Sequence, residues 1–305
     1  YALLYLRIYM LGAPVILLYN FEAAIFRSAG DTKTPLIALA SSGVLNVLLN
    51  LFFVVVLRMT VEGVAIATVV SNAVSAAILY NRLRKHSGDI HVELRKLCID
   101  RRVLGQALRI GVPAGVQSAM FSVSNIVIQA AVNTLGTTVM AASSAAFNVE
   151  VFAYYVMNGF TQACTTFVGQ NYGAGQLTRC RKTLKLSMLE AAAALGATIV
   201  LVLLSGHFLL SLFNRDPAVI AIGYTRLVYI FAAYPFTMIY EMLSGYLRGF
   251  GHSLVPAALT VLGICGVRIV WILLAFPQNP TFETILTAYP ISLFATALFL
   301  TVATV

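Results

Sequence analysis

The sequence predicts an all-α polytopic membrane protein built from two related lobes, and three observations support this fold class. The chain of 305 residues is 60% hydrophobic and only 10% charged, far below the roughly 25% charged residues of soluble domains. Its apolar runs are about 20 residues long, which suits helices that cross a bilayer and exceeds the length of barrel strands. A segment also repeats along the chain, and an internal repeat sets the architecture.

The repeated segment lies at 14–35 and again at 235–256. Identical residues stand at matched places in both copies and beyond them: Pro14 and Pro235, Tyr19 and Tyr240, Arg27 and Arg248, Gly30 and Gly251, Pro35 and Pro256, Glu62 and Glu283, Ser71 and Ser292. An even number of apolar spans separates the copies, so both cross the membrane in the same direction. This pattern is typical of parallel repeats related by an axis along the membrane normal.

Nine membrane spans are predicted, in this order: 5–26, 35–57, 61–81, 110–132, 137–165, 184–206, 219–246, 255–276 and 282–305. The fifth is longer than one straight crossing needs, so we expect it to bend or to project from the membrane. Lysines and arginines gather in alternate connections, after spans one, three, five and seven, which predicts that these connections are cytoplasmic. The net charge of +9 therefore reflects orientation in the membrane and not binding to nucleic acid.

Three segments follow from this pattern of spans. Residues 1–81 form the last three helices of one lobe, and 110–305 form a complete six-helix lobe. Residues 82–109 form the polar linker between them, either lying along the cytoplasmic membrane surface near anionic headgroups or forming a solvated loop. The parallel repeat leaves the first lobe three helices short, so we expect about three helices before Tyr1.

Acidic residues inside apolar spans are the strongest functional signal, because a charged side chain at the bilayer centre costs roughly 2.5–3.5 kcal/mol on insertion scales. Such a residue persists mainly where it faces a cavity, a partner or an ion. The candidates for a role in transport are Glu22, Glu150 and Glu241, whereas Glu190 is assigned a structural role.

One face of the fifth span is polar along its length and carries Ser143, Glu150, Tyr154, Asn158 and Thr161 at helical spacing. We expect this face to line a cavity; a hydrogen-bonded seam between helices is the alternative. The preceding span has a stripe of its own, made of Ser118, Ser122, Asn125 and Gln129. The hypothesis is that the two stripes face each other across the second lobe.

Glu241 shares a helix face with Tyr234, Met238 and Gly245. Aromatic and methionine side chains beside a carboxylate suit a lipophilic cation. The alternative is a structural ion pair between Glu241 and Arg268 of the following span, which substrate or proton binding can break. Arg268 is the one deep arginine in this interpretation, against three deep acids, and this balance favours cationic cargo.

The first copy of the repeat holds further candidates. Glu22 is either a coupling carboxylate or a hydrogen-bond acceptor. Asn46 and Asn50 share a helix face, and Asn50 can offer a carbonyl oxygen to sodium but cannot carry a proton. Arg27 and Arg248 end the repeated segments, where each can reach lipid headgroups, hold a gate or cap a helix C-terminus; we expect capping. The histidines and cysteines have no metal-like or disulfide-like spacing.

Several motifs resemble the multidrug and toxic compound extrusion (MATE) family. They are RSAGDTKTP at 27–35, RGFGHSLVP at 248–256, VGQNYGA at 168–174, LNVLLN at 45–50 and AYPIS at 288–292, and the FNVE at 147–150 is most similar to members from Gram-positive anaerobes. The resemblance covers the whole chain as helices four to twelve of twelve. It departs from the family at Asn50, where some members have a cation-binding aspartate, and at Phe121, where another branch has a glutamate.

The resemblance implies a monomeric plasma-membrane antiporter in which two lobes rock around a central cavity. It implies efflux of cationic or amphipathic small molecules against inward Na⁺ or H⁺, with membrane lipid around it and no other cofactor. No phosphate loop, nucleophile elbow or zinc motif occurs, so we expect no enzymatic activity. The alternatives are a lipid-linked sugar flippase of a related two-lobe fold, whose cavity should be lined by arginine and lysine, and a membrane enzyme or receptor.

Overall fold

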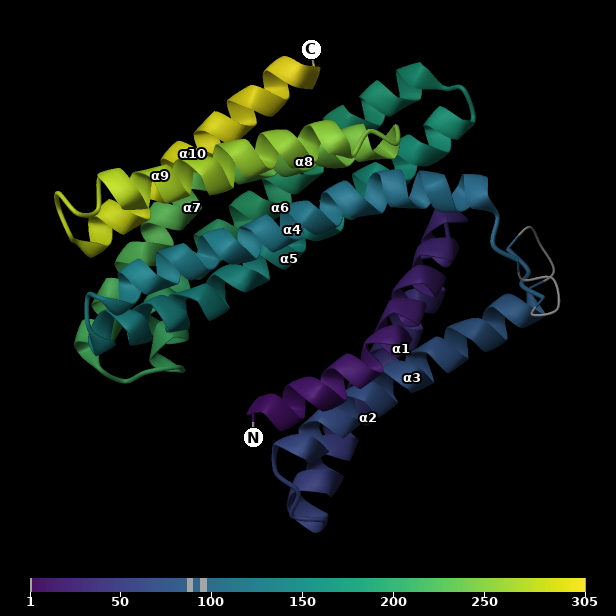
Figure 1. Cartoon of the computed structure of the whole chain (residues 1–305), viewed down its shortest axis with the longest axis horizontal. Coiled ribbons are helices and arrows are strands. Elements are labelled where there is room, and N and C mark those ends of the chain that lie inside the picture. Colours follow the sequence, from purple (N-terminus) through teal and green to yellow (C-terminus); the bar gives the residue numbers. More distant parts are fainter. Residues whose placement is uncertain (1, 87–89, 94–97, 305) are drawn as a thin grey trace. The chain divides into compact units, whose positions relative to one another are not determined.

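The computed structural model describes residues 2–86, 90–93 and 98–304 (Figure 1). The described residues are mostly helical and contain no strand, and nine of their helices are long and apolar enough to cross a membrane. This confirms the predicted fold class. The chain divides after Ile99 into two compact units, here called unit 1 and unit 2.

The described residues of unit 1 form three membrane-length helices, each antiparallel to the next along the chain. They are α1 (Ala2–Ser28), α2 (Lys33–Leu51), which the π-helix η1 (Phe52–Val56) continues, and α3 (Val61–Lys85). Helix α3 packs against both α1 and α2, which touch each other little. Phe26, Leu79 and Leu83 are among the buried side chains at this packing.

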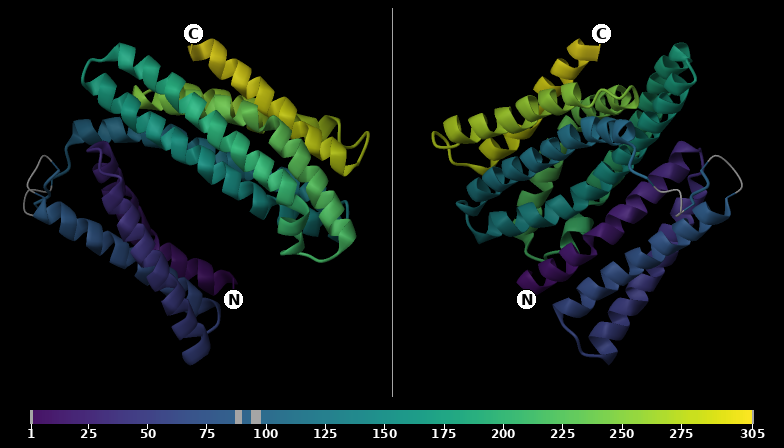
Figure 2. Two further views of the ribbon diagram at one scale, coloured as in Figure 1. Left: turned by 180° about the vertical axis from the view of Figure 1, so that it is seen from behind. Right: turned by 45° about the vertical axis from the view of Figure 1, so that its right-hand side comes forward.

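Unit 2 contains six membrane helices, one of them interrupted by a π-turn. The elements are α4 (Arg101–Asn133), α5 (Thr137–Gly173), α6 (Leu177–Ser211), α7 (Pro217–Gly249), α8 (Leu254–Thr260), η3 (Val261–Gly266), α9 (Val267–Leu274) and α10 (Phe282–Thr304). Helices α5, α6 and α7 pack against one another, and α10 packs against α7 and the run from α8 to α9 (Figures 1 and 2). Asp100 and Asp216 cap the first turns of α4 and α7 through their side chains.

The sequence repeat is also a repeat in three dimensions. In each copy the third helix packs against the other two: α3 against α1 and α2, and α10 against α7 and α8–α9. Both first helices end in the same turn, with a glycine at positive φ, 87° in Gly30 and 82° in Gly251. The matched backbone bonds are Gly30 N to Arg27 O (3.0 Å), Asp31 N to Phe26 O (3.0 Å), Gly251 N to Arg248 O (2.8 Å) and His252 N to Leu247 O (3.0 Å). This left-handed glycine turn is a common way to end a helix.

The copies differ by one residue in their second helices, because η3 lies in the second copy before the matched position. A π-turn adds one residue to a helix, so everything after it rotates by roughly 100°. In unit 1, Asn46 Nδ2 donates to Ser71 Oγ at 3.2 Å. In unit 2, Arg268 Nε donates to Ser292 Oγ, the matched serine, at 3.0 Å. Arg268 therefore takes the structural place of Asn46, although the sequence offset aligns Asn46 with Val267.

Several helices are longer than the apolar runs predicted. Helix α5 continues from 137 to 173, and at 1.5 Å per residue its 37 residues reach well beyond the ~30 Å hydrocarbon layer. The predicted linker at 82–109 is too long, because 82–85 belong to α3 and 101–109 to α4. Hydropathy marks where a helix meets lipid, whereas backbone hydrogen bonding continues into the polar interface. Residues 87–89 and 94–97 of the linker lie outside the described residues.

Helices α5 and α7 approach closely at Gly245. A Cβ atom at this position would lie 2.9 Å from Thr161 Cγ2 and 3.1 Å from the backbone oxygen of Thr161. We expect Gly245→Ala to lower the free energy of unfolding by about 1–3 kcal/mol, the usual cost of overpacking. Gly159→Ala is the matched control, since a Cβ there meets nothing within 4 Å. Thermal unfolding of both purified variants tests this, and equal stability would contradict the close packing.

Candidate functional site

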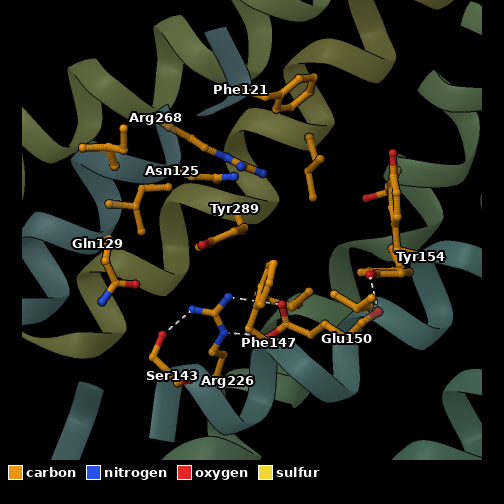
Figure 3. Close-up of a pocket in the computed structure, with 18 of the residues that line it drawn as sticks. Phe121, Asn125, Gln129, Ser143, Phe147, Glu150, Tyr154, Arg226, Arg268 and Tyr289 are labelled. Carbon is orange, nitrogen blue, oxygen red and sulfur yellow. Dashed lines mark hydrogen bonds and ion pairs between the residues drawn. The ribbon is translucent and has the colours of Figure 1, made fainter. Parts of the chain in front are cut away.

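Unit 2 contains a partly open cavity of about 890 Å³ between α4, α5, α7, α9 and α10. This volume lies within the range of small-molecule sites, roughly 300–1,000 Å³. Aromatic rings contribute much of its wall, and the polar side chains that also line it are Ser118, Asn125, Gln129, Ser143, Ser144, Glu150, Tyr154, Arg226, Tyr234, Thr237, Tyr240, Glu241, Arg268 and Tyr289. Figure 3 shows Arg226 and Arg268 on opposite sides of Tyr289 in this cavity.

The polar stripes of α4 and α5 meet in this cavity. Ser118, Asn125 and Gln129 come from α4, and Ser143, Glu150 and Tyr154 come from α5. The arrangement is the one that the two-stripe hypothesis describes, while a role in transport stays a prediction. The stripes reach the cavity over only part of their length. Ser122, Asn158 and Thr161 are not lining residues, and the buried Thr161 instead contacts Met242 of α7, with 3.6 Å between Oγ1 and Sδ.

Glu150 is held in a buried ion pair with Arg226 of α7. Arg226 Nε donates to Glu150 Oε1 at 2.7 Å, and Nη2 donates to Oε2 at 3.1 Å. Nη1 donates to Ser143 Oγ at 2.7 Å, so all three guanidinium nitrogens have acceptors (Figure 3). Both charged side chains are about 5–6% exposed. The Glu150 carboxylate is therefore committed to a fixed partner in this structure, and it is not free for a mobile cation.

Arg226 is the residue that the sequence analysis missed. It stands nine residues after the start of α7, and Glu150 stands thirteen after the start of α5. These helices begin on the same side of the membrane, so the two residues lie at similar depth and the longer arginine side chain covers the difference. A deep arginine normally has a partner. The similar depth of Arg226 and Glu150 is therefore the feature of the sequence that indicates their ion pair.

The predicted alternative of a Glu241–Arg268 ion pair is wrong. Among the described residues the buried ion pair is that of Glu150 with Arg226, and none joins Glu241 to Arg268. Arg268 bonds to Ser292, and its guanidinium carbon lies 4.4 Å from the centre of the Tyr289 ring. The rotation imposed by η3 carries Arg268 onto Ser292 and Tyr289 of α10. Glu241 also lines the cavity and is 9% exposed.

The residues predicted to share a helix face with Glu241 do not all line the cavity. Tyr234 and Glu241 line the cavity, but Met238 and Gly245 do not. Met238 packs with the apolar residues of α5 and α6, and Gly245 lies against Thr161 of α5. Met238 is therefore a packing residue in this structure and not a cavity contact. The reason is geometric: one side of α7 faces the cavity, and the neighbouring side faces α5 and α6.

The two arginines of the repeated turns differ in their surroundings. Arg248 was expected to cap the C-terminus of its helix, but its Nη2 donates to Gln117 Oε1 of α4 at 2.9 Å. It therefore joins the end of α7 to α4. Arg27 is half-buried in the last turn of α1.

The remaining candidates lie in unit 1. Glu22 is 4% exposed, and its Oε2 has no hydrogen-bond partner among the described residues. Asn50 Nδ2 donates to Asn46 Oδ1 at 3.0 Å, while the buried Oδ1 of Asn50 has no partner in the part of the chain that the structure describes. Within the described ranges, no group of three or more His, Cys, Asp or Glu side chains is placed to hold a metal ion. Asn50 Oδ1 and Glu22 Oε2 are thus single oxygen atoms with unused acceptor capacity.

Two family models match the chain. The model described as MatE matches residues 113–274, and the model described as Lipid II flippase MurJ matches residues 3–127. Among curated proteins, the probable multidrug resistance protein YoeA of Bacillus subtilis is 27% identical over 272 residues, which are 87% of this chain and 59% of YoeA. The probable multidrug resistance protein YpnP of the same organism is 28% identical, with 87% and 59% covered. The chain thus spans about three-fifths of the length of these relatives.

Solved structures share the fold. A transporter of the MOP superfamily from Pyrococcus furiosus matches with a TM-score of 0.91 at 20% identity, covering 99% of this chain and 68% of that one. An outward-facing multidrug resistance MATE family transporter matches with a TM-score of 0.88 at 20% identity, covering 97% and 67%. At this level of identity the likeness is one of architecture.

Proposed function

The chain belongs to the MatE family, and from this premise we propose that it acts within a secondary active exporter of cationic or amphipathic small molecules. It is a multi-pass protein of the plasma membrane. The proposed exporter is a monomer surrounded by membrane lipid. It exchanges its cargo for Na⁺ or H⁺ by alternating access, the mechanism typical of two-lobe transporters.

The observation that supports cationic cargo is Glu241. It is buried, it lines a cavity with Tyr154 and Tyr234, and it has no ion pair among the described residues. A carboxylate without a fixed counter-ion, beside aromatic rings, suits an organic cation that supplies the missing charge. Glu150 no longer supports this proposal, because Arg226 neutralises it.

The coupling ion has separate candidates in unit 1. The oxygens of Glu22 and Asn50 that lack a hydrogen-bond partner within the described ranges can each accept a cation. Glu22 suits either ion because a carboxyl group can also carry a proton, whereas an amide oxygen suits only Na⁺. A sodium-driven exporter therefore draws on both residues, and a proton-driven exporter on Glu22.

Transport in inverted membrane vesicles tests the proposal. We expect the intact protein to move ethidium when either a sodium gradient or a proton gradient is imposed, and to stop when the gradient is collapsed with an ionophore. Vesicles from cells that lack the protein are the control. Absence of ethidium movement with both gradients would reject the drug exporter.

A second candidate is a lipid flippase. The match to the MurJ model and the presence of a second arginine deep in the cavity favour it. The cavity holds two deep arginines, not one, since Arg226 joins Arg268. Yet Arg226 is paired with Glu150, so Arg268 and Glu241 are the charged lining residues that form no ion pair with any described residue. Protein-dependent movement of a fluorescent lipid-linked sugar between the leaflets of proteoliposomes, without ethidium transport, would favour this candidate.

A further inference from the structure

Arg268 is a buried cation, and no acidic side chain of the described residues forms an ion pair with it. It is 7% exposed and lines the cavity of unit 2. Its one hydrogen bond within the described part of the chain runs from Nε to Ser292 Oγ. A guanidinium group has five N–H donors, so the four on Nη1 and Nη2 find no acceptor among these residues. Burying a charge is costly unless hydrogen bonds and an opposite charge accompany it.

Arg226 provides an internal comparison in the same cavity. All three of its nitrogens donate, and a bidentate carboxylate neutralises it. Arg268 has only a neutral hydroxyl and the face of Tyr289, 4.4 Å from its guanidinium carbon. The Tyr289 ring lies beside the guanidinium, and Nη1 and Nη2 stay available for a further ligand. Described residues thus satisfy all three nitrogens of Arg226 but only Nε of Arg268.

The repeat shows that the bond to Ser292 does not require an arginine. At the same place in unit 1, Asn46 donates the equivalent hydrogen bond to Ser71. A neutral amide is sufficient for that contact, so the positive charge and the extra donors of Arg268 serve another purpose. In the described residues around the cavity, the charged lining groups other than Arg268 are Glu150, Arg226 and Glu241, and none is bonded to Arg268.

We propose that Arg268, oriented by Tyr289 and Ser292, is an oxyanion subsite that binds the carboxylate of small amphipathic substrates. A planar fork of N–H donors matches a carboxylate in bidentate geometry. With Glu241 in the same cavity, the site accepts zwitterions, whose cationic part meets the glutamate and whose carboxylate meets the arginine. The cavity volume of about 890 Å³ suits a small molecule better than a glycolipid headgroup. This inference rests on the proposed export function.

Binding of a matched pair of dyes tests the subsite without requiring transport. Rhodamine B carries a xanthene cation and a free carboxylate, and its ethyl ester keeps the cation but loses the anion. Their fluorescence anisotropy with the intact purified protein gives two dissociation constants. We expect wild type to bind the acid about tenfold more tightly than the ester, the effect of one charged hydrogen-bonded contact. In Arg268→Gln the acid should lose this advantage, and the ester should change much less than the acid.

Two further variants separate the subsite from a structural role. Arg268→Lys keeps a positive charge without the fork, so we expect it to fold and to retain part of the preference for the acid. Glu241→Gln should weaken both dyes alike, because both carry the cation, and should leave their ratio as in wild type. Together these variants keep the test valid if Arg268→Gln is poorly folded.

The outcomes distinguish the subsite from the export function. Equal affinity of wild type for the two dyes, or a preference that persists in Arg268→Gln, would overturn the subsite. Competition by vesicles of phosphatidylglycerol against the acid but not the ester would assign the arginine to a lipid phosphate and would also overturn it. If the preference for the acid depends on Arg268 but neither ion gradient drives ethidium, the subsite stands and the export function fails.

Discussion

The Glu150→Gln variant is expected to lose roughly 3–5 kcal/mol of unfolding free energy, the usual cost of removing one partner of a buried ion pair. Glutamine cannot neutralise Arg226, whose charge would remain buried at about 5% exposure with only hydroxyl and amide acceptors. Denaturant unfolding of the purified protein in detergent, and its amount in the membrane, measure this loss. We expect both the unfolding free energy and the amount of protein in the membrane to fall strongly, so that any loss of transport follows from the loss of folded protein.

The double variant Glu150→Gln, Arg226→Gln is the control for this expectation. It removes both charges and leaves two amides that can bond to each other and to Ser143, so most of the lost stability should return. Ser143→Ala removes only the third acceptor of Arg226 and should cost about 1–3 kcal/mol. If Glu150→Gln is as stable as wild type, the ion pair does not stabilise the fold and this expectation is wrong.

The double variant also separates two roles that one substitution confuses. Transport that returns with stability would mean that the pair only holds α5 against α7. Transport that stays absent in a stable protein would mean that the pair itself works, for example by opening during the transport cycle. Loss of transport in Glu150→Gln alone therefore does not identify a substrate-binding carboxylate.

Sequence patterns predicted the helices and the repeat well, since both depend on local properties. Apolar runs report contact with lipid, and matched residues such as Gly30 and Gly251 report a turn that needs positive φ. The ends of helices were less predictable. Helix α5 continues to Gly173, because backbone hydrogen bonding extends beyond the apolar run that hydropathy detects.

The sequence predicts which face of a helix lines the candidate site, but not which side chain each residue contacts there. Helical spacing correctly placed Ser143, Glu150 and Tyr154 on one side of α5, because the phase of a helix is fixed by its period. Which neighbour each side chain meets depends on packing between helices, which the period does not contain. The π-turn η3 moves Arg268 by one position around its helix. Arg268 therefore bonds to Ser292 and does not pair with Glu241 as predicted.

Glu241→Gln is expected to act oppositely to Glu150→Gln, with stability preserved and transport of organic cations reduced. Glu241 has no ion pair in the described structure, so its neutralisation breaks no ion pair and removes a desolvation cost. A charged contact to cargo contributes about 1.5–3 kcal/mol, so ethidium efflux at low substrate should fall roughly 10- to 100-fold. Vesicle transport beside thermal unfolding of the same preparation measures both effects.

Met238→Leu is the matched control on the same helix. Met238 packs toward α5 and α6 outside the cavity, and leucine has a similar volume, so transport should equal that of wild type. Loss of Glu241→Gln protein from the membrane would show instead that the carboxylate supports the fold. Unchanged efflux in a stable Glu241→Gln protein would remove Glu241 from the substrate path. The two buried glutamates of this cavity are thus expected to differ because Arg226 pairs with the carboxylate of Glu150, whereas no described arginine pairs with that of Glu241.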